Sequence, residues 1–196
     1  MNSRSPQACK RLRRSAQRGA TLIEVLISVV ILLVALLGTA GLIARSSQSE
    51  MESYQRVQAL TLLQDMAARL NANRQAAACY ASGATITTAG STSVPAPVCT
   101  VGTAAQQSIA SADLAAWGAA LLGSAESNGG KTVGAMIGAL GCIEALDAAN
   151  QIYRITVAWQ GLAKTTAPAL PCGNGQFGND SYRRAVSIQV RIGVLS

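Results

Sequence analysis

The hydrophobic pattern of this 196-residue chain begins with one long apolar segment. Residues 25–44 are apolar apart from Ser28 and Thr39, and about 20 such residues span a bilayer. Glu24 directly precedes them. A carboxylate costs roughly 2.5–3.5 kcal/mol at the centre of a membrane helix and less near its end, so Glu24 needs a reason beyond anchoring.

The helical pattern continues beyond the apolar segment. Residues 45–74 contain no proline or glycine, and apolar residues recur there in steps of three and four, as on one face of a helix. This stripe comprises Val57, Leu60, Leu63, Ala67 and Leu70, widened by Met51, Leu62 and Met66. We expect one helix of about 55 residues, about 80 Å long, whose second half covers a following domain. A two-stranded coiled coil is the alternative, but the stripe lasts only about three heptads.

Two glycines, Gly38 and Gly41, lie near the far end of the apolar segment. Glycine costs about 1 kcal/mol in a helix interior, so this stretch is a place for local softening. Close packing against another helix is the second interpretation, and the sequence favours neither.

The middle of the chain predicts a loop followed by a helix. Residues 76–102 have little charge, and Val94–Pro97 cannot be helical, so we expect a loop with a short strand near residues 84–88. A helix is predicted from Ser111 as N-cap to Gly123 as stop, with Asp113 in its first turn. Its buried side is predicted to hold Leu114, Trp117, Leu121 and Leu122, with Trp117 as a core residue.

The last third predicts strands. Residues 131–139 are a weak candidate, whereas residues 151–160 and 182–195 alternate well. One face of the first alternating strand holds Tyr153, Ile155, Val157 and Trp159, and its other face holds Ile152, Arg154, Thr156, Ala158 and Gln160. In the second, the expected inward residues are Val186, Ile188, Val190 and Ile192, and the outward ones are Ser187, Gln189 and Arg191. A small antiparallel sheet packed on the amphipathic half of the long helix gives an α+β fold, with residues 161–180 as a loop.

The positive charge is concentrated at the N-terminus. Of 16 basic residues, six lie in residues 1–19, which contain no acid, so the remainder holds 10 basic and 9 acidic residues. The basic ones at the start are Arg4, Lys10, Arg11, Arg13, Arg14 and Arg18. This distribution is typical of a cytoplasmic topogenic signal. It argues against nucleic-acid binding, for which only a patch of Arg154, Arg183, Arg184 and Arg191 remains as a candidate.

Five cysteines are present, and Cys9 lies in the basic N-terminal segment. The other four lie in a part of the chain that the charge pattern places outside the inner membrane, where disulfides form. Four cysteines allow three connectivities. We favour Cys79–Cys99 and Cys142–Cys172, which close short loops, with free buried thiols as the alternative. No Cys-x-x-Cys spacing and no histidine occur, so neither a metal nor a cofactor is expected.

An enzymatic function is disfavoured. Without histidine there is no Ser-His-Asp triad and no common general base. The one close pair of acids outside the long helix, Glu144 and Asp147, is predicted to lie on a short exposed turn. Asp65 and Arg69 are four residues apart on a helix, which predicts an ion pair; docking of another protein is the alternative role for both.

The run Gly19-Ala20-Thr21-Leu22-Ile23-Glu24 resembles the class III signal of type IV prepilins and related pseudopilins. That pattern is a short charged leader, glycine, usually phenylalanine, and then Thr-Leu-Ile-Glu before an apolar run; Ala20 departs from it. The resemblance implies that a prepilin peptidase cuts between Gly19 and Ala20 and methylates the new amine of Ala20. It also implies that Glu24 attracts the Ala20 amine of a neighbouring subunit during filament assembly.

Residues 59–74 resemble the segment that follows the anchor in PilV-type minor pilins, with Asp65, Arg69, Ala72 and Asn73 in register. The resemblance implies a pilin fold and a minor pilin, a structural subunit that helps prime a type IV pilus near its tip, with links to adhesion and twitching motility. The implied partners are prepilin peptidase, other minor pilins, the major pilin, the inner-membrane assembly platform and a tip adhesin.

The expected organisation is a cytoplasmic leader (1–19), the transmembrane half of the helix (20–44), its amphipathic half (45–75) and a periplasmic pilin domain (76–196). The protein would be a single-pass inner-membrane protein before it enters an extracellular pilus. Alternatives are a minor pseudopilin of a type II secretion system and a DNA-uptake pilin. Pseudopilins often bind calcium through a late acidic loop, and the loop 161–180 holds only Asp180, which disfavours that site. The exposed loops 80–110 and 161–181 are where binding specificity is expected.

Overall fold

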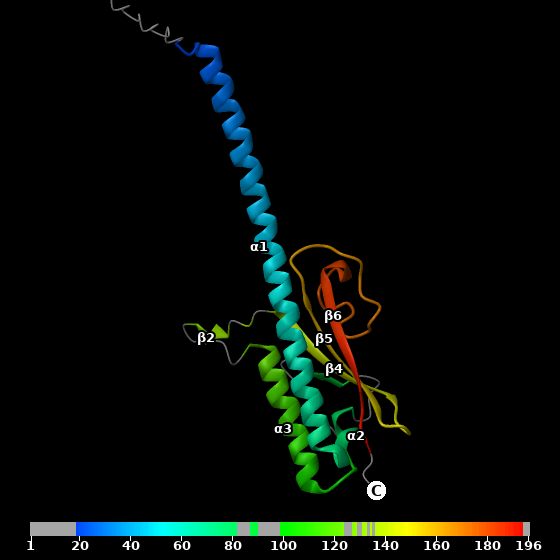
Figure 1. Ribbon diagram of the computed structural model, residues 1–196. Coiled ribbons are helices and arrows are strands. Elements are labelled where there is room, and N and C mark those ends of the chain that lie inside the picture. The colour runs from blue at the N-terminus through cyan, green and yellow to red at the C-terminus, as the bar shows by residue number, and fades with distance from the viewer. Residues whose placement is uncertain are drawn as a thin grey trace, which may run out of the picture. The chain divides into compact units, whose positions relative to one another are not determined.

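The computed structural model describes residues 19–81, 87–89, 99–123, 127–128, 131–132, 134 and 136–193 (Figure 1). The chain divides into two compact units, residues 1–45 and residues 46–196, and each is described by itself. Some expected features lie outside the described residues. They are the leader up to Arg18 with Cys9, the Val94–Pro97 turn and residues 84–86 of the first expected strand.

The first unit contains the beginning of helix α1 (Leu22–Ala72), which starts directly after Thr21. The backbone N–H groups of Glu24 and Val25 donate to the Thr21 carbonyl at 3.0 and 3.2 Å. The Glu24 N–H also lies 3.4 Å from the Thr21 hydroxyl. Thr21 thereby satisfies donors that the first turn of a helix leaves without partners. In the described part of the chain, α1 is the one helix whose length and apolar composition would let it cross a membrane.

In the second unit, α1 is amphipathic, and its buried face agrees with the prediction from Leu62 to Leu70 but differs from it before Leu62. The buried residues are Gln55, Ala59, Leu62, Leu63, Met66 and Leu70. Val57 and Leu60, which were expected on this face, are 59% and 40% exposed, and Met51 is also exposed. The prediction is correct for Leu62, Leu63, Met66 and Leu70 and wrong before them, where Gln55 and Ala59, which carry little hydrophobic signal, occupy the buried face.

Helix α3 (Ala104–Leu121) lies beside the second half of α1 and is longer than predicted (Figure 1). It begins after Thr103, whose hydroxyl accepts from the Gln106 N–H while the Gln106 side chain accepts from the Thr103 N–H. This reciprocal capping box fixes the helix start, so the predicted N-cap at Ser111 was wrong. Ser111 lies inside the helix and donates to the Gln107 carbonyl.

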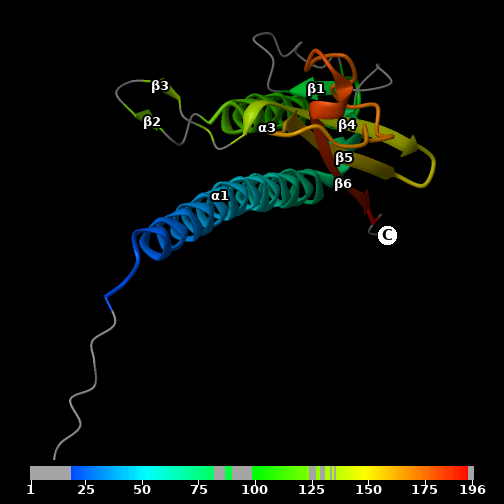
Figure 2. The ribbon, with the colours of Figure 1, turned by 90° about the horizontal axis from the view of Figure 1, so that it is seen from above.

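Two short helical segments, η1 (Arg74–Ala76) and α2 (Ala77–Tyr80), follow α1. A four-stranded antiparallel sheet forms the other layer, in the order β1-β4-β5-β6. Its strands are β1 (Thr87–Ala89), β4 (Ile137–Asp147), β5 (Ile152–Gln160) and β6 (Arg183–Arg191). The short strands β2 (Ser127–Asn128) and β3 (Lys131–Thr132) pair with each other, apart from this sheet (Figure 2), and η2 (Asp180–Tyr182) precedes β6. The predicted architecture, a long N-terminal helix packed on a small antiparallel sheet, is confirmed.

Strand β4 corrects two predictions. Residues 131–139 do not form one strand, because β3 ends at Thr132 and β4 begins at Ile137. Glu144 and Asp147 lie on β4 rather than on a short turn. Glu144 pairs across the sheet with Arg154, with 3.3 Å between carboxylate oxygen and guanidinium nitrogen.

Both faces of β5 are buried. The face with Tyr153, Ile155, Val157 and Trp159 packs in the main core, as predicted. On the opposite face, Thr156 and Ala158 are also buried, at 3% and 0% exposed. Ala158 packs in a second cluster with Cys142, Cys172, Phe177 and Ala185, because the 161–180 loop folds back over the sheet.

Strand β6 follows its predicted alternation, with Val186, Ile188 and Val190 half-buried against the main core. Its outward residues Ser187, Gln189 and Arg191 are exposed.

Within the second unit, two buried tryptophans bind its part of α1. The Trp117 ring, on α3, donates its N–H to the Leu62 carbonyl at 2.9 Å. The Trp159 ring, on β5, donates to the Gln55 side-chain oxygen at 3.1 Å. A buried indole usually finds such a partner, and here both partners lie on α1. The prediction of Trp117 as a core residue is confirmed, because it is fully buried with Leu114 and Leu121; Leu122, in contrast, is 45% exposed.

Candidate functional site

The segment around Gly19 is exposed in the described structure. Gly19 and Ala20 precede the first helical residue, and Glu24 lies in the first turn of α1. A negative charge in the first turn is favourable because the N-terminal end of a helix carries a partial positive charge. Glu24 lies four residues after Ala20. Its carboxylate is therefore on the same short segment as the amine that cleavage is expected to create at Ala20.

The fold itself does not require glycine at residue 19. A Cβ atom built there meets nothing within 4 Å, and the same is true at Gly38 and Gly41. Neither Gly38 nor Gly41 has a positive φ. The described residues thus give no packing reason for glycine at residue 19, in keeping with an interaction outside them.

The apolar beginning of α1 is exposed along its whole length in this single chain, with large side chains 50–84% exposed. Its exposed large residues are Leu22, Ile23, Val25, Leu26, Ile27, Val29, Val30, Ile31, Leu32, Leu33, Val34, Leu36, Leu37, Leu42 and Ile43. A soluble monomer rarely exposes a continuous apolar surface of this extent. Lipid or other protein chains must therefore cover it.

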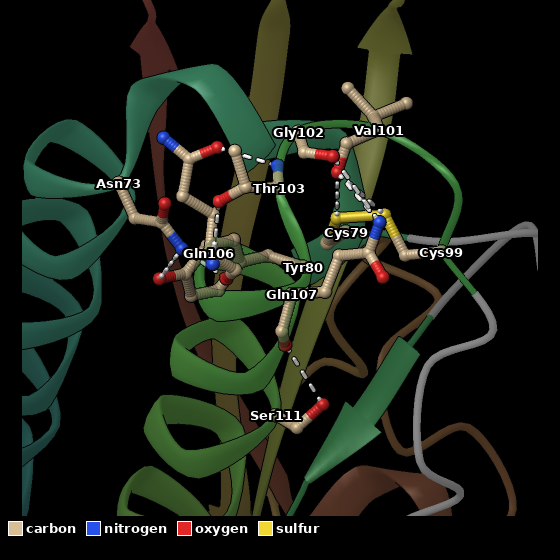
Figure 3. Close-up of a disulfide and its surroundings, with 10 residues drawn as sticks. All are labelled: Asn73, Cys79, Tyr80, Cys99, Val101, Gly102, Thr103, Gln106, Gln107 and Ser111. Atoms are coloured by element: carbon tan, nitrogen blue, oxygen red, sulfur yellow. Dashed lines mark hydrogen bonds between the residues drawn. A yellow bond between two sulfur atoms is a disulfide. The ribbon is translucent and has the colours of Figure 1, made fainter.

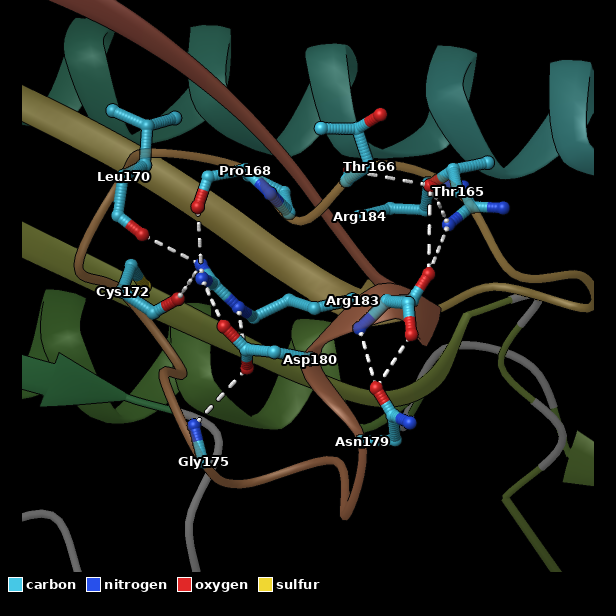
Figure 4. A network of polar contacts seen from close by, with 11 residues as sticks. Thr165, Thr166, Pro168, Leu170, Cys172, Gly175, Asn179, Asp180, Arg183 and Arg184 are labelled. Carbon is cyan, nitrogen blue, oxygen red and sulfur yellow. Dashed lines mark hydrogen bonds and ion pairs between the residues drawn. The ribbon is translucent and has the colours of Figure 1, made fainter.

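In the second unit, the 161–180 loop is organised around Arg183, the first residue of β6 (Figure 4). Its guanidinium is buried and donates to the carbonyls of Pro168, Leu170 and Cys172 at 3.0, 2.6 and 3.0 Å. It also donates to both carboxylate oxygens of Asp180, at 3.1 and 2.7 Å. The five donors of a guanidinium suit such a set of oxygens, so Arg183 acts as an internal cation for the loop.

Asp180 is a hydrogen-bonded member of this network. Its carboxylate also accepts from the Gly175 N–H at 3.2 Å. The hydrogen bonds from Arg183, and then that from Gly175, hold the pKa of Asp180 below its ordinary value. The one acid that the sequence offered for a loop calcium site is thus already bound to a guanidinium.

Arg184, the next residue of β6, also contacts the 161–180 loop. It donates to the Ala163 carbonyl at 2.8 Å and to the Thr165 hydroxyl at 2.7 Å. It also pairs with Glu52 of α1 at 3.1 Å. Of the four arginines considered as a nucleic-acid patch, Arg154, Arg183 and Arg184 each form an ion pair with a carboxylate.

Two disulfides close the loops of the second unit, and they are the pairs that the sequence analysis favoured. Cys142 in β4 is bonded to Cys172, which ties the 161–180 loop to the sheet. Cys79 in α2 is bonded to Cys99 (Figure 3). Gln107 of α3 lies beside this second bridge and donates to the Val101 carbonyl at 3.4 Å.

A polar network joins α1, α2 and α3. Arg69 pairs with Asp65, as predicted, at 2.9 Å, and also with Asp113 of α3 at 2.8 Å. The Tyr80 hydroxyl donates to Asp113 and accepts from Asn73. Burial, followed by the hydrogen bond to Asp113, raises the pKa of Tyr80. These contacts give Arg69 a structural role within the chain.

The sequence analysis did not identify the hydrogen-bond network around Arg183 or the one that contains Asp113 and Tyr80. Asp180 and Arg183 are three residues apart. That spacing alone does not show whether they form an ordinary surface ion pair or, as here, the hydrogen-bonded centre of a loop. Asp113 was expected in a first helical turn, whereas it lies mid-helix facing Arg69. The Thr103-x-x-Gln106 capping signal was visible in the sequence and would have corrected that register.

Comparison with known families matches two adjacent segments. Residues 14–40 match the prokaryotic N-terminal methylation motif, and residues 41–117 match the family described as Type IV pilin Tt1218. No match to a curated protein or to a solved structure was found. The methylation motif implies processing by a prepilin peptidase and incorporation into a pilus, and the apolar helix suggests membrane anchoring. The pilin family is structural rather than enzymatic. Fold and matches thus support one identification, a type IV pilin with a prepilin leader.

Proposed function

We propose that the chain is a minor pilin, a structural subunit that helps prime a type IV pilus and becomes part of it at or near the tip. Cleavage falls between Gly19 and Ala20, and the new amine of Ala20 is methylated. Residues 20–44 then serve first as membrane anchor and later as filament core, residues 45–75 join them to the pilin domain, and residues 76–196 face the periplasm.

One observation carries the proposal: the exposed apolar beginning of α1, residues 22–44, has a single carboxylate, Glu24, in its first turn. Lipid explains the apolar surface but not the acid. An ammonium and a carboxylate that both face hydrocarbon lower each other's cost by pairing. The amine of Ala20 on a neighbouring subunit is the natural partner, because subunits packed side by side bring one helix start next to another.

The minor-pilin assignment rests on the resemblance of residues 59–74 to PilV-type proteins. Its partners would be prepilin peptidase, the assembly platform, other minor pilins, the major pilin and a tip adhesin. A minor pseudopilin of a type II secretion system is the second candidate. The commitment of Asp180 to Arg183 weighs against the calcium loop that pseudopilins often carry. A DNA-uptake pilin is weaker still, because three candidate arginines already pair with acids.

The test begins with the intact mass and N-terminal sequence of the protein from membranes, with and without prepilin peptidase. We expect a chain that starts at methylated Ala20, and the full-length chain when the peptidase is missing. A mature chain that still starts at Met1 would overturn the proposal.

The assembly role is tested with Glu24→Gln and, as matched control, Glu50→Gln on the exposed surface of the same helix. Both variants should be cleaved. Glu24→Gln should be lost from sheared pili, whereas Glu50→Gln should remain there at the low copy number of the parent chain. Normal incorporation of Glu24→Gln, or recovery of the parent chain only with a secretion system, would contradict the proposal.

A further inference from the structure

A hollow of about 260 Å³ lies where η1 and α2 meet the turn between β4 and β5. Short apolar side chains from α2, from the end of β4 and from Val101 form much of its wall. The polar residues that line it are Arg74, Gln75, Gln151 and Tyr153. No acid is present among the described residues of this lining, so the hollow carries a net positive charge.

Tyr153 marks the hollow as more than a surface depression. The residue is only 3% exposed, yet its hydroxyl makes no hydrogen bond to any described residue. Every fully enclosed side-chain oxygen or nitrogen of the described residues does have a partner. The Tyr153 hydroxyl must therefore reach open space, and the hollow is the space that this side chain lines. Burial alone raises the pKa of Tyr153, in keeping with a hydroxyl that lacks a partner.

The other polar groups add donors to the same place. Arg74 is exposed and forms no ion pair with any described residue. The Gln75 side-chain oxygen already accepts from Gln106 at 2.7 Å, which leaves its amide N–H groups for a ligand. Gln151 is held at φ 51°, with its backbone N–H bonded to Ala148 and its carbonyl accepting from Ile192.

We propose that this hollow binds the carboxylate of a peptide segment from a partner protein. A single guanidinium matches the single charge and planar fork of a carboxylate, whereas a doubly charged phosphate calls for more than one cation. The Tyr153 hydroxyl and the Gln75 amide supply the remaining donors. Because the volume lies below the roughly 300–1,000 Å³ of small-molecule pockets, it suits one or two peptide residues with short side chains against the apolar wall.

The test uses the full chain in detergent micelles and ligand-observed NMR titration. The first probe is acetyl-Ala-Ala as the free acid, compared with its amide and with acetate. The variants are Arg74→Gln and Tyr153→Phe, each with a matched control on the exposed surface of α1, Arg56→Gln and Tyr54→Phe. Thermal unfolding of each variant checks that the fold is retained.

We expect the amide to bind at least about tenfold more weakly than the acid, because a charge-assisted hydrogen bond is lost. Arg74→Gln should weaken the acid about tenfold and Tyr153→Phe about threefold, with both controls unchanged. Equal binding of acid and amide, or acetate binding as tightly as the peptide, would overturn the proposal. Acetyl-Glu-N-methylamide as a further probe separates the two sources: stronger binding than acetyl-Ala-Ala indicates a side-chain carboxylate, and weaker binding a chain terminus.

Discussion

Arg183→Met is the most informative single substitution in the pilin domain. The methionine keeps a long apolar stem in the buried space but removes all the donors. Three loop carbonyls and the Asp180 carboxylate would then lose their common partner. Because the Cys142–Cys172 bond stays intact, the loop remains attached to the sheet and only its internal order is tested.

The expected loss follows from the burial of each partner. Breaking a buried ion pair by removing one member costs about 3–5 kcal/mol. Arg183 is 2% exposed, but the Asp180 side chain is 30% exposed and regains water. Solvent screening on that side lowers the figure, so we expect about 3 kcal/mol. This is a large fraction of the roughly 5–15 kcal/mol that stabilises a typical domain.

The assay is chemical denaturation of the full chain in detergent micelles, followed by the fluorescence of the buried Trp117 and Trp159. Arg191→Met is the matched control, because Arg191 lies on the same strand with its side chain exposed, and it should change the free energy of unfolding by less than about 0.5 kcal/mol. Hydrogen exchange of the loop amides should accelerate in Arg183→Met alone. If Arg183→Met falls within about 1 kcal/mol of Arg191→Met and the loop amides stay protected, the guanidinium does not organise the loop.

Two further predictions concern the core and the pH dependence of stability. Gly141→Ala should destabilise the fold by about 1–3 kcal/mol or more, because the new Cβ would lie 2.2 Å from the Trp117 ring, whereas Gly193→Ala, with nothing within 4 Å, should be neutral in the same denaturation assay. Stability should also fall above about pH 10, the ordinary tyrosine pKa, because the folded state raises the pKa of Tyr80 and so favours its neutral form. The decrease in unfolding free energy from pH 8 to pH 11 should be smaller in Tyr80→Phe and unchanged in the exposed control Tyr54→Phe.

The elements that could be predicted from sequence are those whose pattern reflects local geometry. Strand β5 alternates because successive side chains point to opposite faces, and its Tyr153–Trp159 face was assigned correctly. The length of α1 followed from the absence of glycine and proline after residue 45. These patterns depend only on residues that are close in the sequence, so they can be recognised without knowledge of the tertiary fold.

The burial of α1 at Gln55 could not be predicted, because it depends on a residue that is distant in the sequence. Gln55 is buried because Trp159, 104 residues later, donates to it, and no local window contains both residues. The loop centre at Arg183 has the same origin, since three of its partners are backbone carbonyls, which any sequence supplies. The buried outer face of β5 likewise depends on where the 161–180 loop returns.

Gly141 and Gly19 cannot be distinguished by sequence, but the structure gives a packing reason for only one of them. Gly141 lowers the strand signal of β4, and the fold explains it, because the Trp117 ring and Leu121 occupy the space where a side chain would begin. A Cβ atom at Gly19 meets no described residue within 4 Å, so the described part of the chain gives no packing reason for glycine there. Alanine at Gly141 should therefore lower stability. Alanine at Gly19 should leave stability unchanged and act only through a partner that binds the segment before Ala20, as a peptidase would at the proposed cleavage site.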